Sequence, residues 1–352
     1  MPESHPHFAE LSAIEAKQKQ AEEIKKSFGT ITGREEFVKT LEKAEQLTEE
    51  ISDDIAVLEE KLNPFEKEIH LARSYEAQVS LLTKAGLLKD LSNGQKGIMS
   101  MDAEGKPTIE SPIPTREEIN EHLINNQETK ETFQKKIEQG FTKLLIVPFG
   151  LPLDKLAQAY KKALQSHFDQ QKLFRTKKEP NDQNEPITEL NADGPMWIGD
   201  TYNNADATGD LVYEPKKLEK DNHGGKTKSE IVAQKGGFKI LLIENMPNIP
   251  REGKAKEKGG RTQIDTKGTT IVKYIEQGKD TPSPKEYLNA IQTESIIATS
   301  PYHKEQPMTP EDQLIYALTH LEETDEVIDD YAGNGSISYQ LGAYFLSSGD
   351  VL

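Results

Sequence analysis

The chain has 352 residues, no cysteine and a formal net charge of −17. The absence of cysteine excludes disulfides, thiol nucleophiles and thiolate metal sites. The acidic charge disfavours general binding to nucleic acid, because the phosphates would repel the chain. The hydrophobic share is 34%, below the roughly 45% of an average globular protein, so part of the chain must be solvated helix surface or loop. The length predicts two or three domains.

The N-terminal sequence MPESHPHFAELSAIEAKQ lacks the basic and apolar regions of a secretory signal. The longest apolar run, residues 144–153, is interrupted by Pro148, Gly150 and Pro152 and is much shorter than the ~20 residues of a membrane span. We therefore expect a cytoplasmic protein that does not bind a membrane.

Residues 1–91 are predicted to form a helical hairpin or a coiled coil. Apolar side chains recur in steps of three and four from residue 41 to residue 69, which is the a/d pattern of a heptad seam. Pro64 predicts that one helix ends near Leu62 and that another begins at the proline. A helical pair packed on itself and an intermolecular coiled coil both fit this pattern. The candidate oligomerisation residues are Leu41, Ile51, Ile55, Leu58 and Leu62.

Residues 92–114 are rich in Gly, Ser and Pro and are predicted to be a linker. Residues 115–194 are predicted to be helical with a polar loop. In this region Thr115 and Glu118 predict a capped helix that runs to about Gln139, and Pro152 predicts the start of another helix. A short buried strand is expected between them, at residues 144–147.

Residues 195–352 are predicted to mix helices and strands, which makes the fold class α+β. The apolar run at residues 238–244 indicates a strand buried on both faces. Pro284 and Pro310 each follow a capping residue and predict the start of a helix. Further strands are expected at residues 196–198, 211–213 and 269–274.

No catalytic, cofactor-binding or metal-binding residue is predicted. The Gly224-Gly225-Lys226-Thr227 sequence ends like a phosphate-binding loop, but Lys220 stands where that motif needs a glycine, so we interpret the segment as a flexible basic loop. Residues 309–330 carry eight acidic residues and are interpreted as a solvated helix face. A cation site or an unrecognised enzyme site near Asp325 and Asp330 is the alternative, although the spacing does not match an EF-hand.

Four strings in the last third of the chain carry a resemblance to known proteins. They are ENMPNIPREGKAKEKGGRTQ from residue 244, SPKEYLNAIQ from residue 283, TPEDQLIYALTHLEETDEVIDDY from residue 309 and GNGSISYQLGAYFLSSGDVL from residue 333. They resemble proteins of candidate-phylum bacteria that look like targets of diversity-generating retroelements. The resemblance implies a C-type-lectin-like C-terminal domain that presents a variable ligand-binding surface.

Proteins of this group continue past the GAYFLSSGDV segment into the variable region, whereas this sequence stops at Leu352. The domain is therefore expected to be incomplete, with an exposed apolar strand at residues 344–346 and poor solubility. The leading hypothesis is a non-enzymatic scaffold for recognition or display, whose partner would be an unknown protein or surface ligand. The alternative is a structural scaffold that self-associates through its N-terminal helices.

Overall fold

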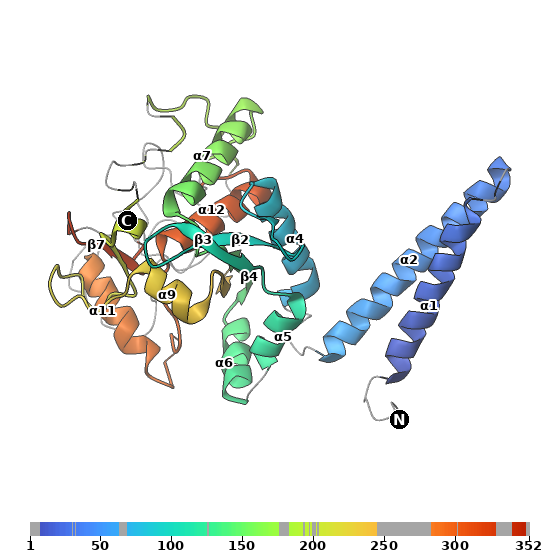
Figure 1. The fold of residues 1–352 in the computed structure, drawn as a ribbon, viewed down its shortest axis with the longest axis horizontal. Helices are drawn as coiled ribbons and strands as arrows, with labels where there is room; N and C mark the ends of the chain where they lie inside the picture. The colour runs from blue at the N-terminus through green and yellow to red at the C-terminus, as the bar shows by residue number, and fades with distance from the viewer. Residues whose placement is uncertain are drawn as a thin grey trace. The chain divides into compact units, whose positions relative to one another are not determined.

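The computed structural model describes residues 8–29, 31, 33–62, 69–124, 127–175, 183–192, 194–196, 198, 202, 204–244, 283–300, 302–328 and 340–349. The chain divides into two compact units, Met1–His70 and Leu71–Leu352, and most of their elements are labelled in Figure 1. The described residues form ten helices and seven short strands. The predicted α+β class, with a helical N-terminal region, is therefore confirmed.

The first unit is a helical hairpin. Helix α1 (Phe8–Ser27) and helix α2 (Arg34–Leu62) lie side by side in Figure 1. Their contacts run in antiparallel order, since Lys17 Nζ lies 2.7 Å from Asp54 Oδ2 while the rings of Phe28 and Phe37 pack edge to face at 5.4 Å. The predicted helix end at Leu62 is confirmed. The helix expected to begin at Pro64 lies outside the described residues.

The second unit is centred on strand β4 (Phe141–Val147), which pairs antiparallel with β6 (Lys239–Glu244). Helices α4 (Leu71–Lys84) and α12 (Pro310–Thr324) pack against β4, and α7 (Leu153–Asp169) packs against α12. The strands expected at residues 144–147 and 238–244 are thus confirmed. The expectation that the second strand is buried on both faces is wrong, because the helices cover β4 and leave most of β6 half-exposed.

Residues 92–114, which composition predicted to be a linker, instead contain two strands of an antiparallel sheet. Its order is β1 (Lys89–Asp90), β2 (Lys96–Met101) and β3 (Pro107–Pro112). The sheet forms because β2 buries apolar side chains, and because the hydroxyl groups of Ser100 and Ser111 bond across the strands at 2.7 Å. Gly105, with φ of +74°, lies in the turn between β2 and β3.

Most of the predicted helix starts are confirmed. The Thr115 amide donates to Glu118 Oε2 at 2.8 Å, and the Glu118 amide donates to Thr115 Oγ1 at 3.2 Å. The single helix expected from this cap to Gln139 is two helices, α5 (Arg116–Ile124) and α6 (Gln127–Glu138). Helix α7 follows Pro152 as predicted, and capping boxes open both α11 (Pro284–Ser295) and α12.

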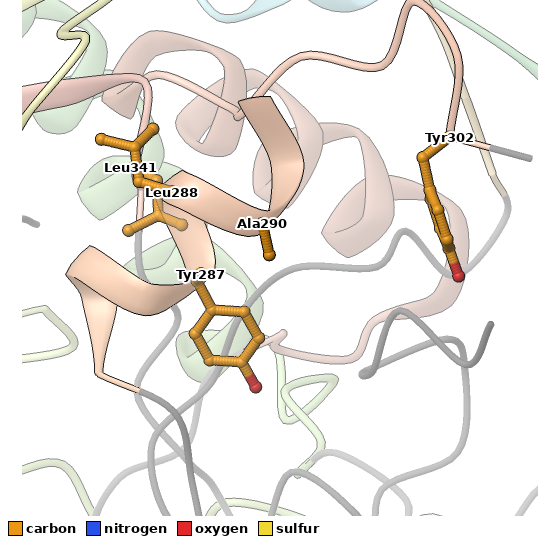
Figure 2. Packing of buried hydrophobic residues seen from close by; sticks show 5 residues of the cluster. All are labelled: Tyr287, Leu288, Ala290, Tyr302 and Leu341. Carbon is orange, nitrogen blue, oxygen red and sulfur yellow. The ribbon is translucent and has the colours of Figure 1, made fainter. Parts of the chain in front are cut away.

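The strand expected to be exposed at residues 344–346 is instead built into the core. Strand β7 (Ala343–Phe345) pairs antiparallel with β5 (Leu211–Tyr213), and all three of its residues are buried. The Ser347 amide and hydroxyl both donate to the Asp210 carboxylate, at 2.8 and 2.7 Å. Just before β7, Leu341 packs beside Leu288 of α11 in an apolar cluster (Figure 2). The expectation of an exposed apolar strand is therefore wrong, because β5 supplies its pairing partner.

The strand expected at residues 196–198 is not found. Met196 and Ile198 belong to no strand. Residues 269–274 lie outside the described residues.

Candidate functional site

The five predicted oligomerisation residues do not share one environment. The Leu41 side chain is 41% exposed, whereas Ile51 and Ile55 are half-buried. The side chains of Leu58 and Leu62 lie outside the described residues. The heptad seam is therefore partly covered and partly open at the surface of the hairpin.

The open part of α2 is an apolar patch that we call the α2 patch, made of Phe37, Val38 and Leu41. Their exposed fractions are 44%, 44% and 41%. Residues three and four apart share one side of a helix, so the three side chains form a continuous surface. Beside Val38 of this patch, four charged residues of both signs line a shallow groove, namely Arg34, Glu35, Lys39 and Glu42. The heptad seam includes Leu41 but misses Phe37 and Val38, which precede its first position.

A second group of residues was missed altogether by the sequence analysis. Lys228 is fully buried, and its Nζ lies 2.6 Å from Asp206 Oδ2 and 2.9 Å from Glu311 Oε1. The side chains of the two acids are 1% and 0% exposed. The Leu151 carbonyl accepts a further hydrogen bond from Lys228 Nζ at 2.5 Å. We call Lys228, Asp206 and Glu311 the buried lysine cluster.

Local backbone structure brings the three residues together. Lys228 is the first residue of α9 (Lys228–Lys235), which Thr227 opens with a capping box. The segment before it was predicted to be a flexible loop, but Lys226 pairs with Tyr213 of β5 and so fixes the start of the helix. Gly225 is required there, because a Cβ atom at this position would lie 2.3 Å from Val212 Cγ1.

The two acids come from helices at distant points of the sequence. Asp206 belongs to the short helix α8 (Ala205–Thr208), and its Oδ2 accepts a hydrogen bond from the Leu153 amide at 2.8 Å. Glu311 lies in the first turn of α12, where the positive end of the helix dipole favours a carboxylate. The cluster thus ties the starts of α7, α9 and α12 to α8.

Aromatic rings border the cluster. The rings of Phe149 and Tyr213 lie 5.4 and 6.0 Å from Lys228 Nζ, and the Tyr213 hydroxyl donates to Glu311 Oε1 at 2.7 Å. Burial by itself would lower the pKa of Lys228, but the charges of Glu311 and Asp206 outweigh it and raise that pKa. Burial, followed by the same two charges, raises the pKa of Tyr213 well above its usual value.

A second ion pair lies next to the cluster. Lys239 Nζ of β6 is 2.5 Å from Asp312 Oδ2, and the same Nζ lies 5.3 Å from the Phe149 ring. Two carboxylate oxygens, Glu311 Oε2 and Asp312 Oδ1, are buried without a hydrogen-bond partner among the described atoms. The two adjacent acids, Glu311 and Asp312, are only 0% and 2% exposed to solvent.

The acidic segment at residues 309–330 is only in part the solvated face that its composition predicted: its first acids are buried, whereas Glu323 and Asp325 are 50% and 41% exposed. Its helix is buried from Pro310 to Thr319, and further along Glu322 pairs with Lys84 and Glu323 pairs with Lys143. Asp325 lies 3.3 Å from His167 Nε2. Asp330 lies outside the described residues. The prediction is wrong for Glu311 and Asp312, because the lysines that pair with them, Lys228 and Lys239, come from other parts of the chain.

None of the helices in the described part of the chain combines the length and apolar character that a bilayer span requires. Comparison of the chain with protein-family models, with curated proteins and with solved structures found no match. The two sites above are therefore interpreted from their own chemistry.

Proposed function

We propose that this chain is a non-enzymatic scaffold protein that self-associates through the α2 patch and so holds several copies of its α+β unit together. The observation that carries the proposal is the continuous exposed surface of Phe37, Val38 and Leu41. Exposed apolar patches with a charged rim are typical of protein–protein interaction sites. We expect this association to take place in the cytoplasm.

The charged rim favours a second copy of the chain as the partner. A twofold interface places the same patch on both sides, so a rim that carries both signs can complement itself. Arg34 and Lys39 supply the positive charges, and Glu35 and Glu42 supply the negative ones. When the patches of two copies meet in antiparallel orientation, the basic side chains of one can face the acidic side chains of the other.

Sedimentation over a range of concentrations tests the proposal. The wild-type chain should associate as its concentration rises, and Leu41→Glu should weaken the association at least tenfold because it places a charge in the apolar contact. Val57→Glu is the matched control, since Val57 is also exposed on α2, at 52%, but lies outside the patch. A wild-type chain that stays monomeric throughout, or a Leu41→Glu variant that associates as wild type does, would refute the proposal.

A second candidate function is the framework of a ligand-recognition head, as the resemblance implies. The anchoring of residues 343–347 supports it, because a framework that presents a variable surface must hold its neighbouring strand rigidly. Strand β7 meets this requirement through its pairing with β5 and the two hydrogen bonds from Ser347 to Asp210. Sequencing the genomic neighbourhood tests this function. The absence of both a reverse transcriptase gene and a near-repeat of coding sequence would rule it out.

A further inference from the structure

The buried lysine cluster includes none of the α2 patch residues, and it brings an amine and two carboxylates together away from solvent. We propose that Lys228 and Asp206 join through an intramolecular amide bond, with Glu311 as the group that carries the protons. The bond would form between Lys228 Nζ and the Asp206 carboxyl carbon. It would be a covalent modification made by the folded chain on itself.

The geometry selects Asp206 as the electrophile. Its Oδ2 is the carboxylate oxygen closest to the amine, at 2.6 Å from Lys228 Nζ. The carboxyl carbon is bonded to this oxygen and is therefore at most one C–O bond length farther from the amine. The Leu153 amide donates to the same oxygen at 2.8 Å. A fixed N–H donor at this position stabilises the negative charge that develops on the oxygen when the amine attacks.

Glu311 has the arrangement expected of a proton carrier. Its Oε1 accepts from Lys228 Nζ at 2.9 Å and from the Tyr213 hydroxyl at 2.7 Å, which fixes the carboxylate beside the amine. Its Oε2 is buried without a partner among the described atoms and can therefore receive a proton. A buried carboxylate oxygen without a partner costs free energy, which a proton or a new hydrogen bond would reduce.

The reaction balances without a further reagent. The Lys228 ammonium group gives up two protons, which Glu311 passes in turn to Asp206 Oδ1, and Oδ1 leaves as water while Oδ2 becomes the amide carbonyl oxygen. The C–O bond to the leaving oxygen breaks as the N–C bond forms. Glu311 ends as a carboxylate, so the net charge of the cluster is the same before and after, and no electron is transferred.

The surroundings favour the step. Amine and carboxyl are held in contact, and such proximity corresponds to an effective concentration of about 10⁵–10⁸ M for well-oriented groups. Burial between Phe149 and Tyr213 by itself favours a neutral amine, although the charges of Glu311 and Asp206 outweigh this effect on the pKa of Lys228. The raised pKa of Lys228 opposes loss of a proton to solvent, but transfer to a neighbouring carboxylate keeps the proton inside the cluster. The same burial protects the amide from hydrolysis.

Intact-mass measurement of the denatured full-length protein tests the proposal. The wild-type mass should be lower than the sequence mass by one water molecule, and a proteolytic digest should contain the Asp206 and Lys228 peptides joined together. Lys228→Arg and Glu311→Gln should both restore the unbridged mass. Lys239→Arg is the matched control, since Lys239 pairs with Asp312 beside the cluster and should keep the loss of water.

The intact mass of the wild-type protein tests the amide bond even if a variant does not fold. A folded wild-type protein with the full sequence mass would overturn the amide bond. A Glu311→Gln protein that folds and still lacks one water would overturn the role of Glu311. Circular dichroism of each variant establishes which of them are folded.

Discussion

Replacement of Lys228 by methionine tests how strongly the buried lysine cluster determines the stability of the second unit. Methionine is similar in length but removes the charge, so Asp206 and Glu311 remain buried without their cation. Removing one partner of a buried ion pair costs about 3–5 kcal/mol, because the remaining charge is uncompensated. If the amide bond forms in the wild type, the variant also loses a covalent crosslink, and the decrease in stability should then be larger than this value.

Thermal unfolding followed by circular dichroism measures this loss. A decrease of that size corresponds to a fall in Tm of roughly 6–20 °C at about 2–4 °C per kcal/mol. Lys285→Met is the control, because Lys285 and its partner Glu219 are 66% and 41% exposed and such pairs contribute about 0–1 kcal/mol. The triple variant Lys228→Met, Asp206→Asn, Glu311→Gln should recover part of the loss, since it leaves no buried charge in the cluster.

Two outcomes would refute this reasoning. A Lys228→Met variant within about 1 kcal/mol of wild type would mean that water or a cation reaches the two carboxylates. A triple variant that is less stable than Lys228→Met alone would mean that the cluster acts through packing and hydrogen bonds and not through its charge.

Two further predictions concern packing and alkaline pH. A Cβ at Gly237 would lie 2.2 Å from Ser100 Oγ, so Gly237→Ala should lower the free energy of unfolding by about 1–3 kcal/mol in urea titration, and an unchanged midpoint would contradict the tight fit. The pKa of Tyr213 is raised above its usual 10.0 by burial and then by Glu311 and Asp206. The folded state therefore retains a proton that the unfolded state loses, and this contribution to stability is complete below pH 10.0 and declines above it. Phenolate absorbance should show Tyr213 ionising only on unfolding, by comparison with Tyr213→Phe, whose stability should fall less between neutral and alkaline pH.

Local signals in the sequence predicted the helix boundaries well. Ser283 and Thr309 each precede a proline and an acidic residue, and each opens a helix with a capping box. These motifs work because their hydrogen bonds join residues three positions apart, so nothing distant decides them. Strand β5 was also predicted, because its three consecutive residues are apolar and include Val and Tyr, which favour strands.

Predictions from composition were wrong where contacts between distant residues determine the structure. Residues 92–114 contain the glycine, serine and proline of a linker, yet Ser100 and Ser111 face each other in a buried sheet. The hydrogen bond between their hydroxyl groups satisfies both, so two polar residues become part of the core. Composition could not predict this hydrogen bond, because it does not show which two serine residues come into contact in the fold.

The two candidate sites also differ in whether the sequence could predict them. The α2 patch follows from helical spacing, since Phe37, Val38 and Leu41 share a helix side wherever the helix lies. The buried lysine cluster has no such signal, because Asp206, Lys228 and Glu311 lie in three separate helices. Their approach depends on the packing of α8, α9 and α12, which local spacing does not encode.

The sequence by itself determined the α+β class, the helix caps and the absence of cysteine chemistry, because each follows from composition or from residues within a few positions of one another. Tertiary structure alone decided that Glu311 and Asp312 are buried and not solvated, and that Tyr344 lies in the core. The physical reason is that burial requires an interaction partner from a distant part of the chain. A charge or an apolar strand is buried only when another part of the chain supplies the opposite charge or the next strand, as Lys228 does for Glu311 and β5 does for β7.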